Sequence, residues 1–344
     1  MKSILDMRFL APLAGLLLIF SCTPADGPDT DASSADGVQL TKADNHVEVS
    51  INGKPFTTYY FGEEAPKPYL HPLRSAKGTV VTRGFPMRTD IEGETQDHPH
   101  HRALYFAHGD INGVDFWAEG QPQGRKVEVA AGRRYVEEGM PRGRAVFKKL
   151  LSAENGEISA QFDLVDPRGD KVLGEMQQTY VFHADEGSRV IDCEFTLTAG
   201  AEAVKLGDTK EGTFAIRVVD ALREKEGLVM VNSEGGKGEK EIWGKPAPWV
   251  DYSGTVEGES LGIAIFDHPG NPKHPTYWHA RGYGLFAANP FGEHHFFNDE
   301  TRDGSVTIEP GTSFTLRYRV VIHPGDAEEA KVAELYESYK ASLQ

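Results

Sequence analysis

Four of the thirteen histidines lie within eleven residues of the chain, between positions 98 and 108. Imidazole titrates near neutral pH and is the commonest metal-ligating side chain, so this density indicates chemistry more than packing. Side chains alternate along an extended chain, so His98 and His100 would face one way and His101 the other. A strand is predicted at residues 103–107, and polar residues at the mouth of a strand are where a rigid scaffold holds reactive groups. A surface loop whose histidines only cap and hydrogen-bond is the alternative interpretation.

Five more histidines lie between residues 268 and 295. Asp-His-Pro occurs in both stretches, and in each a histidine and an arginine precede a Leu/Phe/Ala strand that ends in a turn. Two equivalent strands whose ends lie beside the same cavity would explain this similarity, and coincidence would explain it equally well. We expect imidazoles from near residue 100 and from near residue 290 to share one solvent-accessible hollow.

Acid–base chemistry is the first use that such a hollow indicates. A histidine or a glutamate would remove a proton, and a second histidine or an arginine would donate one or stabilise the developing charge. Glu293, which precedes His294, is the strongest candidate base. The candidate catalytic residues are His98, His101, Arg102, His279, Glu293 and His294.

Metal binding is the second use. The spacing His98-x-His100 suits a site on a strand, and His108 or His294 would complete it. A divalent ion held there, such as Zn²⁺ or Ca²⁺, would polarise a substrate oxygen or activate water. Two short histidine clusters are not a metal-site signature, so the sequence leaves metal-free chemistry open.

Aromatic and polar residues beside the two clusters are candidate substrate contacts. Trp117 and Trp278 adjoin the clusters, and an indole ring can stack on the C–H face of a sugar. Arg281, like Arg102, would hold a carboxylate or hydroxyl group. The predicted substrate-binding residues are Trp117, Trp278, Arg281 and Asn289. Packing in the core or at the rim is the alternative role for each tryptophan.

The elements that must position these residues are mostly strands. Long strands are predicted at 158–165, 172–183 and 189–198, and the turn signals Asn52-Gly53 and 166–170 separate neighbouring strands. The chain shows no alternation of strands and helices and no glycine-rich phosphate loop, which argues against a parallel α/β fold and a nucleotide cofactor. We therefore predict an all-β fold, a large two-sheet antiparallel β-sandwich.

One substantial helix is predicted at about 326–342, where apolar residues recur at three- and four-residue spacing. This helix would pack its apolar stripe against a large sheet. No linker is visible inside residues 38–344, so we expect them to form a single domain.

The N-terminal residues predict export from the cytosol. Basic residues precede an apolar run, residues 9–20, that is too short to span a bilayer and ends at Ser21-Cys22. This ending resembles a bacterial lipobox, so Cys22 would become the lipidated N-terminus; an ordinary secretory peptide is the alternative. Residues 1–21 would be the lipoprotein signal peptide and 22–37 a flexible acidic tether. We expect the protein in the cell envelope, in the periplasm or at the outer membrane, with membrane contact only through the anchor.

Composition excludes several partners and sites. A formal net charge of −16 repels nucleic acid and anionic membrane surfaces, so neither is expected as a partner. Cys193 is the single cysteine beyond Cys22, which excludes a zinc site built on cysteines. Its position in an alternating stretch predicts a small core residue.

Three motifs together resemble a bacterial family of unknown function that is often labelled "methane oxygenase PmoA". They lie at residues 97–102, 108–117 and 283–292. The resemblance spans the predicted domain. Relatives tend to be exported and to sit among sugar-processing genes, which implies a carbohydrate context, whereas the label implies a metal-dependent oxygenase that contains copper or iron.

The predicted architecture is similar to that of galactose-mutarotase-like sandwiches. Enzymes of that kind pair histidines with a carboxylate in a cleft on one sheet. By this resemblance the corresponding residues would be His98 or His101, His279 and Glu293. Fold alone does not give function, so these roles remain an analogy.

Three functions remain in view. The first is an exported, lipid-anchored enzyme that acts on a sugar or oligosaccharide by histidine/carboxylate acid–base chemistry, as a hydrolase, lyase or epimerase. The second is a non-catalytic glycan-binding lipoprotein, and the third is the metal-dependent oxygenase that the family label implies. Binding modules rarely need so many titratable groups, which favours the enzyme.

Overall fold

Strands dominate the computed structural model, which describes residues 37–120, 125–129, 132–136 and 139–343. These residues belong to one compact unit. The predicted signal peptide, Cys22 and all but the last residue of the predicted tether lie outside the described residues. Among the helices that are described, none is both long enough and apolar enough to cross a membrane.

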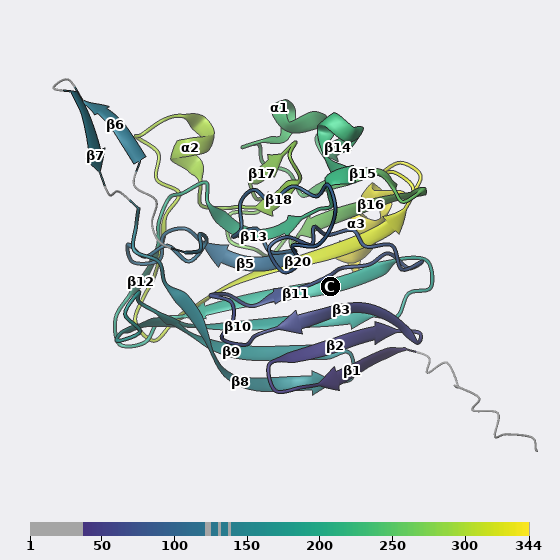
Figure 1. The fold of residues 1–344 in the computed structure, drawn as a ribbon, viewed down its shortest axis with the longest axis horizontal. Helices are drawn as coiled ribbons and strands as arrows, with labels where there is room; N and C mark the ends of the chain where they lie inside the picture. Colours follow the sequence, from purple (N-terminus) through teal and green to yellow (C-terminus); the bar gives the residue numbers. More distant parts are fainter. Residues whose placement is uncertain (1–36, 121–124, 130–131, 137–138, 344) are drawn as a thin grey trace, which may run out of the picture. The chain divides into compact units, whose positions relative to one another are not determined.

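Two antiparallel sheets of eight strands each make up most of the fold (Figure 1). Sheet A contains, in order across the sheet, β1 (Val38–Lys42), β2 (His46–Ile51), β3 (Lys54–Tyr60), β4 (Tyr69–Leu70), β5 (Leu104–His108), β13 (Gly212–Arg217), β18 (Leu285–Ala288) and β17 (Trp278–Arg281). Sheet B contains β14 (Val229–Asn232), β15 (Trp249–Val256), β16 (Glu259–Asp267), β20 (Ser313–Pro324), β11 (Arg189–Thr198), β10 (Val172–His183), β9 (Glu157–Val165) and β8 (Arg144–Glu154). Two smaller sheets pair β6 (Arg125–Val129) with β7 (Gly132–Val136), and β12 (Val204–Leu206) with β19 (Val306–Ile308).

Local sequence explains these strands and their turns. In β11 every second residue is buried, so Cys193 and Phe195 face inward while Glu194 faces outward. Cys193 is therefore the core residue that its sequence context predicted. Asn52 and Gly53 join β2 to β3 with φ angles of 51° and 71°, the positive values that a type I′ hairpin turn requires.

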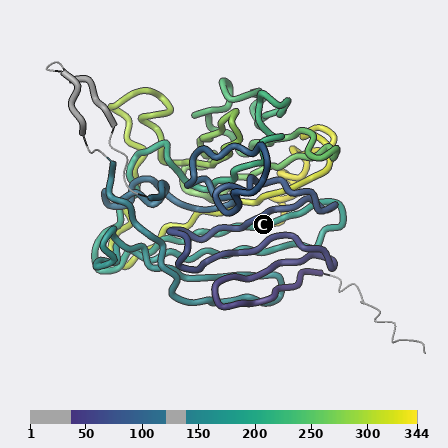
Figure 2. Tube along the Cα trace, in the orientation of Figure 1, coloured from purple at the N-terminus to yellow at the C-terminus, as the bar shows by residue number. Residues whose placement is uncertain are grey.

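The core lies between the inner faces of the two sheets. Phe106 of sheet A stacks on Phe195 of sheet B, with ring centroids 4.3 Å apart. Phe214 of sheet A and Tyr318 of sheet B form a second stacked pair at 4.9 Å. Burial of each such ring contributes about 1.5–3 kcal/mol to stability. Two large antiparallel sheets packed face to face confirm the predicted sandwich, and Figure 2 traces the same two layers along the chain.

The C-terminal helix α3 (Val332–Ala341) packs on the outer face of sheet B. Tyr336 and Tyr339 of the helix pack against Phe266 of β16, and Val332 belongs to the same apolar cluster. Asp326 accepts hydrogen bonds from backbone N–H groups two and three residues later, which closes a separate turn before the helix. The other described helices are short: α1 (Gly238–Ile242), α2 (Glu293–Phe297), and the 3₁₀ turns η1 (Asp220–Leu222) and η2 (Glu224–Glu226).

Candidate active site on the outer face of sheet A

A row of side chains in register crosses the outer face of sheet A from β3 to β17. Neighbouring strands place the following residues opposite one another in turn: Tyr60, Tyr69, Tyr105, Ala215, Ala287 and His279. The tyrosines and alanines of β4, β5, β13 and β18 belong to an apolar cluster on the face opposite the sandwich core. Tyr105 and the two alanines are fully buried, so the middle of this row lies beneath the side chains that reach the surface.

A cavity of about 410 Å³ lies at the His279 end of this row, within the range of volumes that small-molecule sites occupy. From the sequence-predicted set it is lined by His98, His100, His101, Trp117, His279 and Arg281. Sequence reasoning did not single out the five further lining residues: Asp115, Ala118, Lys210, Glu211 and Tyr283. The structure thus brings imidazoles from near residue 100 together with His279, but the two histidines nearest residue 290, His294 and His295, do not line this cavity.

Asp97 and His98 form a hydrogen-bonded pair at the cavity. The Nδ1 atom of His98 lies 2.5 Å from Oδ2 of Asp97. Since the carboxylate only accepts, Nδ1 is the donor, and in the neutral ring the lone pair is then on Nε2. His98 also has a φ of +46°, an uncommon backbone conformation for a residue with a side chain. This geometry is that of a histidine base oriented by a carboxylate.

Two buried arginines hold the Asp97 carboxylate in place. Arg83 and Arg217 donate to its Oδ1 atom at 2.6 and 2.8 Å, and both guanidinium side chains are almost fully buried. Burial alone would raise the pKa of Asp97, but Arg217, the hydrogen bond from His98 and Arg83 together lower it to about 2. Asp97 is therefore a permanent anion at neutral pH, and it fixes the ring orientation of His98.

His101 is held in the opposite tautomer to His98. Arg217 donates to its Nδ1 atom at 3.3 Å, and because a guanidinium cannot accept, the proton of the neutral ring is on Nε2. Burial, and after it the neighbouring His100 and Arg217, hold the pKa of His101 well below its usual value. His101 is thus a neutral hydrogen-bond donor beside a histidine base. Burial likewise lowers the pKa of His100 to about 3.

Tyr283 stacks against the histidine base. Its ring lies parallel to His98 with centroids 5.1 Å apart, and His98 lies parallel to His101 at 4.8 Å. Burial raises the pKa of Tyr283 to about 12, although Arg281 and Arg217 beside its ring oppose this shift. Tyr283 therefore keeps its proton at neutral pH and can act as a donor.

His279 completes the set of cavity imidazoles. Its Nδ1 atom donates to the carbonyl oxygen of Lys210 at 2.6 Å, which leaves a lone pair on Nε2. Burial lowers the pKa of His279 to about 4, so the ring is neutral at physiological pH. Burial alone would raise the pKa of the neighbouring Glu211, but Lys210 outweighs burial and lowers it. The indole N–H of Trp117, a residue that lines the cavity, is buried and has no hydrogen-bond partner among the described residues.

Four predicted residues point away from this cavity, and their assignments are corrected here. Arg102 forms a two-bond ion pair with Glu119, at 2.8 Å for both hydrogen bonds, and lines a different cavity. Trp278 alternates with His279 along β17, so its ring lies in the sandwich core and cannot stack on a sugar. Asn289 is buried and bonds Thr209 and Phe291. His108 is fully buried on β5, where its Nε2 atom lies 2.9 Å from the carbonyl oxygen of Gly207.

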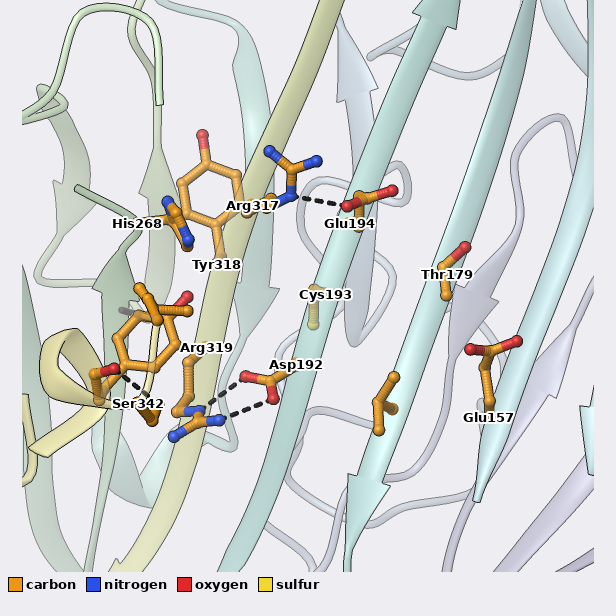
Figure 3. A pocket seen from close by; sticks show the side chains of 13 residues that line it. Glu157, Thr179, Asp192, Cys193, Glu194, His268, Arg317, Tyr318, Arg319 and Ser342 are labelled. Atoms are coloured by element: carbon orange, nitrogen blue, oxygen red, sulfur yellow. Dashed lines mark hydrogen bonds and ion pairs between the residues drawn. The ribbon is translucent and has the colours of Figure 1, made fainter. Parts of the chain in front are cut away.

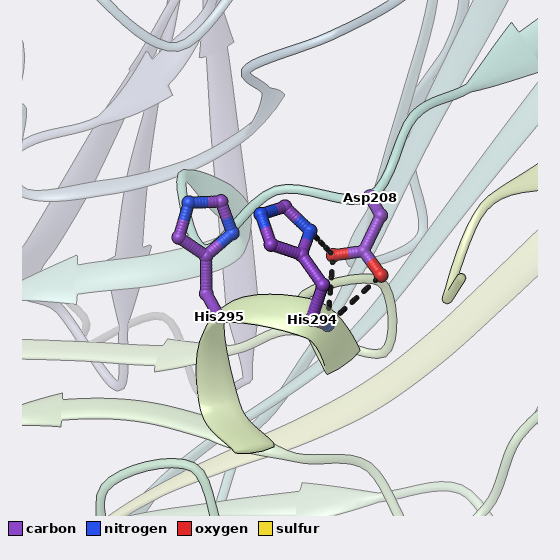
Figure 4. Close-up of side chains that lie close together, drawn as sticks. All are labelled: Asp208, His294 and His295. Atoms are coloured by element: carbon purple, nitrogen blue, oxygen red, sulfur yellow. Dashed lines mark hydrogen bonds and ion pairs between the residues drawn. The ribbon is translucent and has the colours of Figure 1, made fainter. Parts of the chain in front are cut away.

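Glu293 and His294 form a second cluster, outside the lining of the site cavity. Glu293 lies 3.5 Å from Lys273 and 3.7 Å from Arg302, so its carboxylate is engaged in ion pairs. It is therefore a poorer candidate base than His98. His294 and His295 project from α2, and Nδ1 of His294 donates to Asp208 at 2.8 Å (Figure 4).

This second cluster is the candidate metal centre. Ligand atoms of Asp208, His294 and His295 lie within 4.8 Å of one another. Two imidazoles with a carboxylate suit Zn²⁺ or a similar transition metal, whereas Ca²⁺ prefers oxygen ligands alone. The predicted set of His98, His100 and His108 is not brought together in the described part of the chain, because His108 lies outside the cavity that the other two line.

Sheet B also carries a cavity, of about 560 Å³, beside α3 (Figure 3). Its charged side chains neutralise one another across β11 and β20. Arg319 pairs with Asp192 at 2.6 and 2.7 Å, and Arg317 pairs with Glu194 at 2.6 Å. This cavity therefore offers paired surface charges and lacks the oriented histidine base of the sheet A site.

Comparison with known proteins gives a family and no activity. The sequence model of a family of unknown function, DUF6807, matches residues 46–337. No curated protein matches the chain in sequence. The match carries no activity, so the methane-oxygenase label stays a prediction.

Several solved structures resemble the fold at low similarity. An α-galactosidase from Lactobacillus brevis matches with a TM-score of 0.39 and 8% identity over 85% of this chain, which spans 40% of that enzyme. A galactose mutarotase-like protein from Clostridium acetobutylicum gives 0.39 and 8%, over 83% of this chain and 98% of the other. A galactose mutarotase-like protein from Lactobacillus casei gives 0.38 and 9%, over 83% and 100%. At these scores the likeness carries no argument about chemistry.

Proposed function

The chain belongs to DUF6807, a family of unknown function, and we propose that it is an enzyme that moves a proton on a sugar or short oligosaccharide. The observation that carries the proposal is the Asp97–His98 pair, which opens onto the cavity of sheet A with its geometry fixed by two buried arginines. In such a pair the carboxylate orients the histidine and stabilises its cationic form, so that the histidine can act as a general base at neutral pH.

Each group at the cavity has a role in this chemistry. The Nε2 atom of His98 removes a proton from the bound substrate, and Asp97 stabilises the imidazolium that forms. Tyr283, which keeps its proton at neutral pH, donates a proton to the substrate atom that must gain one. The N–H groups of His101 and Trp117 stabilise negative charge that develops on a substrate oxygen.

A histidine that removes a proton from the substrate suits elimination or epimerisation better than hydrolysis. Glycoside hydrolysis commonly needs two carboxyl groups, one protonated and one ionised, on either side of the scissile bond. Asp115 and Glu211 both line the cavity, and burial raises the pKa of Asp115 while Glu211 remains ionised. Hydrolysis with Asp115 as acid and Glu211 as base is therefore the second candidate. Asp115 is less free to act, because it accepts two backbone N–H bonds at 2.8 and 3.0 Å.

A substrate panel tests the proposal. We expect turnover of one or more neutral glycosides or uronides, followed as new unsaturation, an inverted centre or a new reducing end. His98→Ala should reduce kcat by about 10²–10⁴-fold while substrate binding persists. The matched control is His183→Ala, because His183 is paired with Asp192 at 2.7 Å on the outer face of sheet B and lies outside the site.

The outcomes separate the candidates. Loss of turnover in His98→Ala with normal activity in His183→Ala supports proton abstraction, whereas loss in Asp115→Asn with little effect in His98→Ala supports hydrolysis. Binding of sugars by the wild type without turnover of any substrate would instead make the protein a glycan-binding lipoprotein. Activity that depends on bound copper or iron would support the oxygenase.

We propose further that the protein is exported and carries a lipid on Cys22. The support is the apolar run at residues 9–20 followed by Ser21-Cys22. Mass spectrometry of the mature N-terminus should show a diacylglyceryl group on Cys22, and Cys22→Ala should release the protein from the membrane fraction. An unmodified N-terminus produced by cleavage elsewhere would contradict the anchor.

A further inference from the structure

A second cavity of about 580 Å³ lies on the same outer face of sheet A, over β3 and β4. Tyr60 and Tyr69, which are stacked at 5.1 Å, contribute to its wall, and they belong to the same row that ends at His279 in the active-site cavity. Its charged lining contains three arginines, Arg74, Arg88 and Arg102, against one carboxylate, Glu64, and His71 also lines it. A basic cavity is unexpected in a chain of net charge −16.

The three arginines differ in what neutralises them. Arg102 is paired with Glu119, and Arg88 with Asp90 at 3.0 and 2.8 Å. Arg74 makes no hydrogen bond or ion pair with any described residue, although burial is enough to lower its pKa. A half-buried guanidinium without a carboxylate is costly to maintain, since its donors lose water without gaining a protein partner.

His71 supplies a second unsatisfied group in the same cavity. Its side chain is 6% exposed, and its Nδ1 atom is buried with no hydrogen-bond partner among the described residues. Burial, and after it Arg74, Arg88 and Arg102, lower the pKa of His71 to about 4, so the ring is neutral. A neutral imidazole still carries one N–H, which can donate to an oxyanion that Arg74 attracts.

The geometry connects this cavity to the active site. In register, Tyr69 of β4 and His279 of β17, which lines the active-site cavity, are four strand spacings apart, about 19 Å across the sheet. Between the cavities, Glu119 bonds both Arg102 and Lys67, and Lys67 donates to the carbonyl oxygen of Trp117. Lys67 and Trp117 cover the buried Tyr105 of the row, so a single ligand would reach both cavities by passing over this network.

We infer that the cavity around Arg74 and His71 binds the carboxylate or sulfate group of an acidic oligosaccharide whose reacting sugar occupies the active-site cavity. The link to a reacting sugar rests on the proposed function, whereas binding of an oxyanion at Arg74 does not. The inference narrows the substrate class from glycans in general to anionic glycans.

Small anions test the subsite without any enzymatic assay. Thermal melting of the intact protein is followed with sodium glucuronate, sodium sulfate and sodium chloride at equal ionic strength. We expect glucuronate or sulfate to raise Tm above the chloride control in the wild type, and the larger of the two effects identifies the group. Arg74→Gln should abolish this rise, whereas Arg317→Gln, which removes an arginine from the outer face of sheet B, should leave it unchanged.

Oligosaccharide binding tests the substrate class. Calorimetric titration with uronate-containing, sulfated and neutral oligosaccharides should show a preference of at least about tenfold for one anionic class, and Arg74→Gln should remove that preference. His71→Asn, which keeps an N–H donor, should retain part of it. Equal binding of neutral and anionic ligands, or an unchanged preference in Arg74→Gln, overturns the inference.

The two proposals fail in different ways. If glucuronate and sulfate stabilise no more than chloride, the anion subsite is wrong whatever the enzyme does. If these anions bind through Arg74 but His98→Ala does not affect turnover, the subsite stands and the proposed acid–base chemistry is wrong.

Discussion

Replacing Asp97 with asparagine separates the charge of this residue from its shape. The amide keeps a carbonyl oxygen that can accept from Arg83 and Arg217, which now hold Oδ1 at 2.6 and 2.8 Å. Its NH₂ group then faces His98, where the carboxylate accepts at 2.5 Å. Because an amide NH₂ only donates, Nδ1 of His98 must become the acceptor and the proton must move to Nε2. The asparagine variant therefore has a histidine whose lone pair points away from the substrate.

The expected loss of stability follows from the bonds that change. Hydrogen bonds to a charged group contribute about 1.5–3 kcal/mol, and neutral ones about 0.5–1.5 kcal/mol. The guanidinium groups of Arg83 and Arg217 stay charged, but in the variant their bonds no longer join opposite charges, so we expect a loss of about 2–3 kcal/mol. The larger cost of breaking a wholly buried ion pair is discounted because the Asp97 side chain is 40% exposed. Tm should fall by about 5 °C or more.

The assay combines stability, tautomer and activity. Urea unfolding gives the free-energy change, and ¹⁵N–¹H long-range NMR correlation identifies which nitrogen of His98 carries the proton. Where a substrate is known, kcat should fall by about 10²–10⁴-fold. Asp192→Asn is the matched control, since Asp192 likewise bonds a histidine, His183, and an arginine, Arg319, but lies on the outer face of sheet B.

Two results would refute this reasoning. If His98 keeps its Nδ1 proton in Asp97→Asn, the carboxylate does not set the tautomer. If activity survives in the asparagine variant at a pH where the wild type is active, His98 is not the base, even if stability falls as expected.

Three other regions give testable outcomes. Gly262→Ala should lower the free energy of unfolding by about 1–3 kcal/mol in urea titration, because the new Cβ would lie 2.3 Å from the His323 ring; an unchanged value would show that the ring can move aside. Burial lowers the pKa of His323, but the hydrogen bond and charge of Asp251 outweigh burial and raise the pKa above 6.5. The pair of His323 and Asp251 therefore stabilises the fold fully below pH 6.5, and this stabilisation is lost as the pH rises through the pKa of His323 in the folded protein. His323→Gln should flatten this decline in urea titrations across pH, and an identical pH profile would contradict it. The double variant His294→Ala/His295→Ala should lose Zn²⁺ measured by equilibrium dialysis, while wild-type protein that takes up no Zn²⁺ would remove the metal centre.

The fold could be predicted because its signals are local. The Asn52-Gly53 turn and the alternation in β11 appear in the structure where their sequence patterns predicted them. Such patterns identify strands and hairpins, and many hairpins without strand-helix units indicate an antiparallel sandwich. The order of strands in sheet A depends on contacts between distant segments, so local patterns do not contain it.

The site could be predicted only in part, because sheet A is buried on both faces at its centre. All five residues of β5 are buried, so their hydrophobicity does not reveal which face carries the cavity. For the same reason Trp278 and His279 looked equally suited to a site, although alternation sends the tryptophan into the core and the histidine outward. A lone arginine at the end of the apolar strand β13, Arg217, was the signal that sequence reasoning passed over.

Arg217 is important because a buried guanidinium group needs an anionic partner, and the bonds that Arg217 makes here determine the tautomers of two cavity histidines. Arg217 donates to Asp97, and Asp97 in turn accepts from His98, so the proton of the His98 ring is on Nδ1. Arg217 also donates to Nδ1 of His101, so the proton of the His101 ring is on Nε2. The carbonyl oxygen of Lys210 in turn fixes a lone pair on Nε2 of His279. Three of the four imidazoles that line the cavity thus divide into two acceptors and one donor, although their side chains are chemically identical. A count of histidines cannot give this division of roles, because each tautomer is set by a partner that lies far away in sequence or on the main chain.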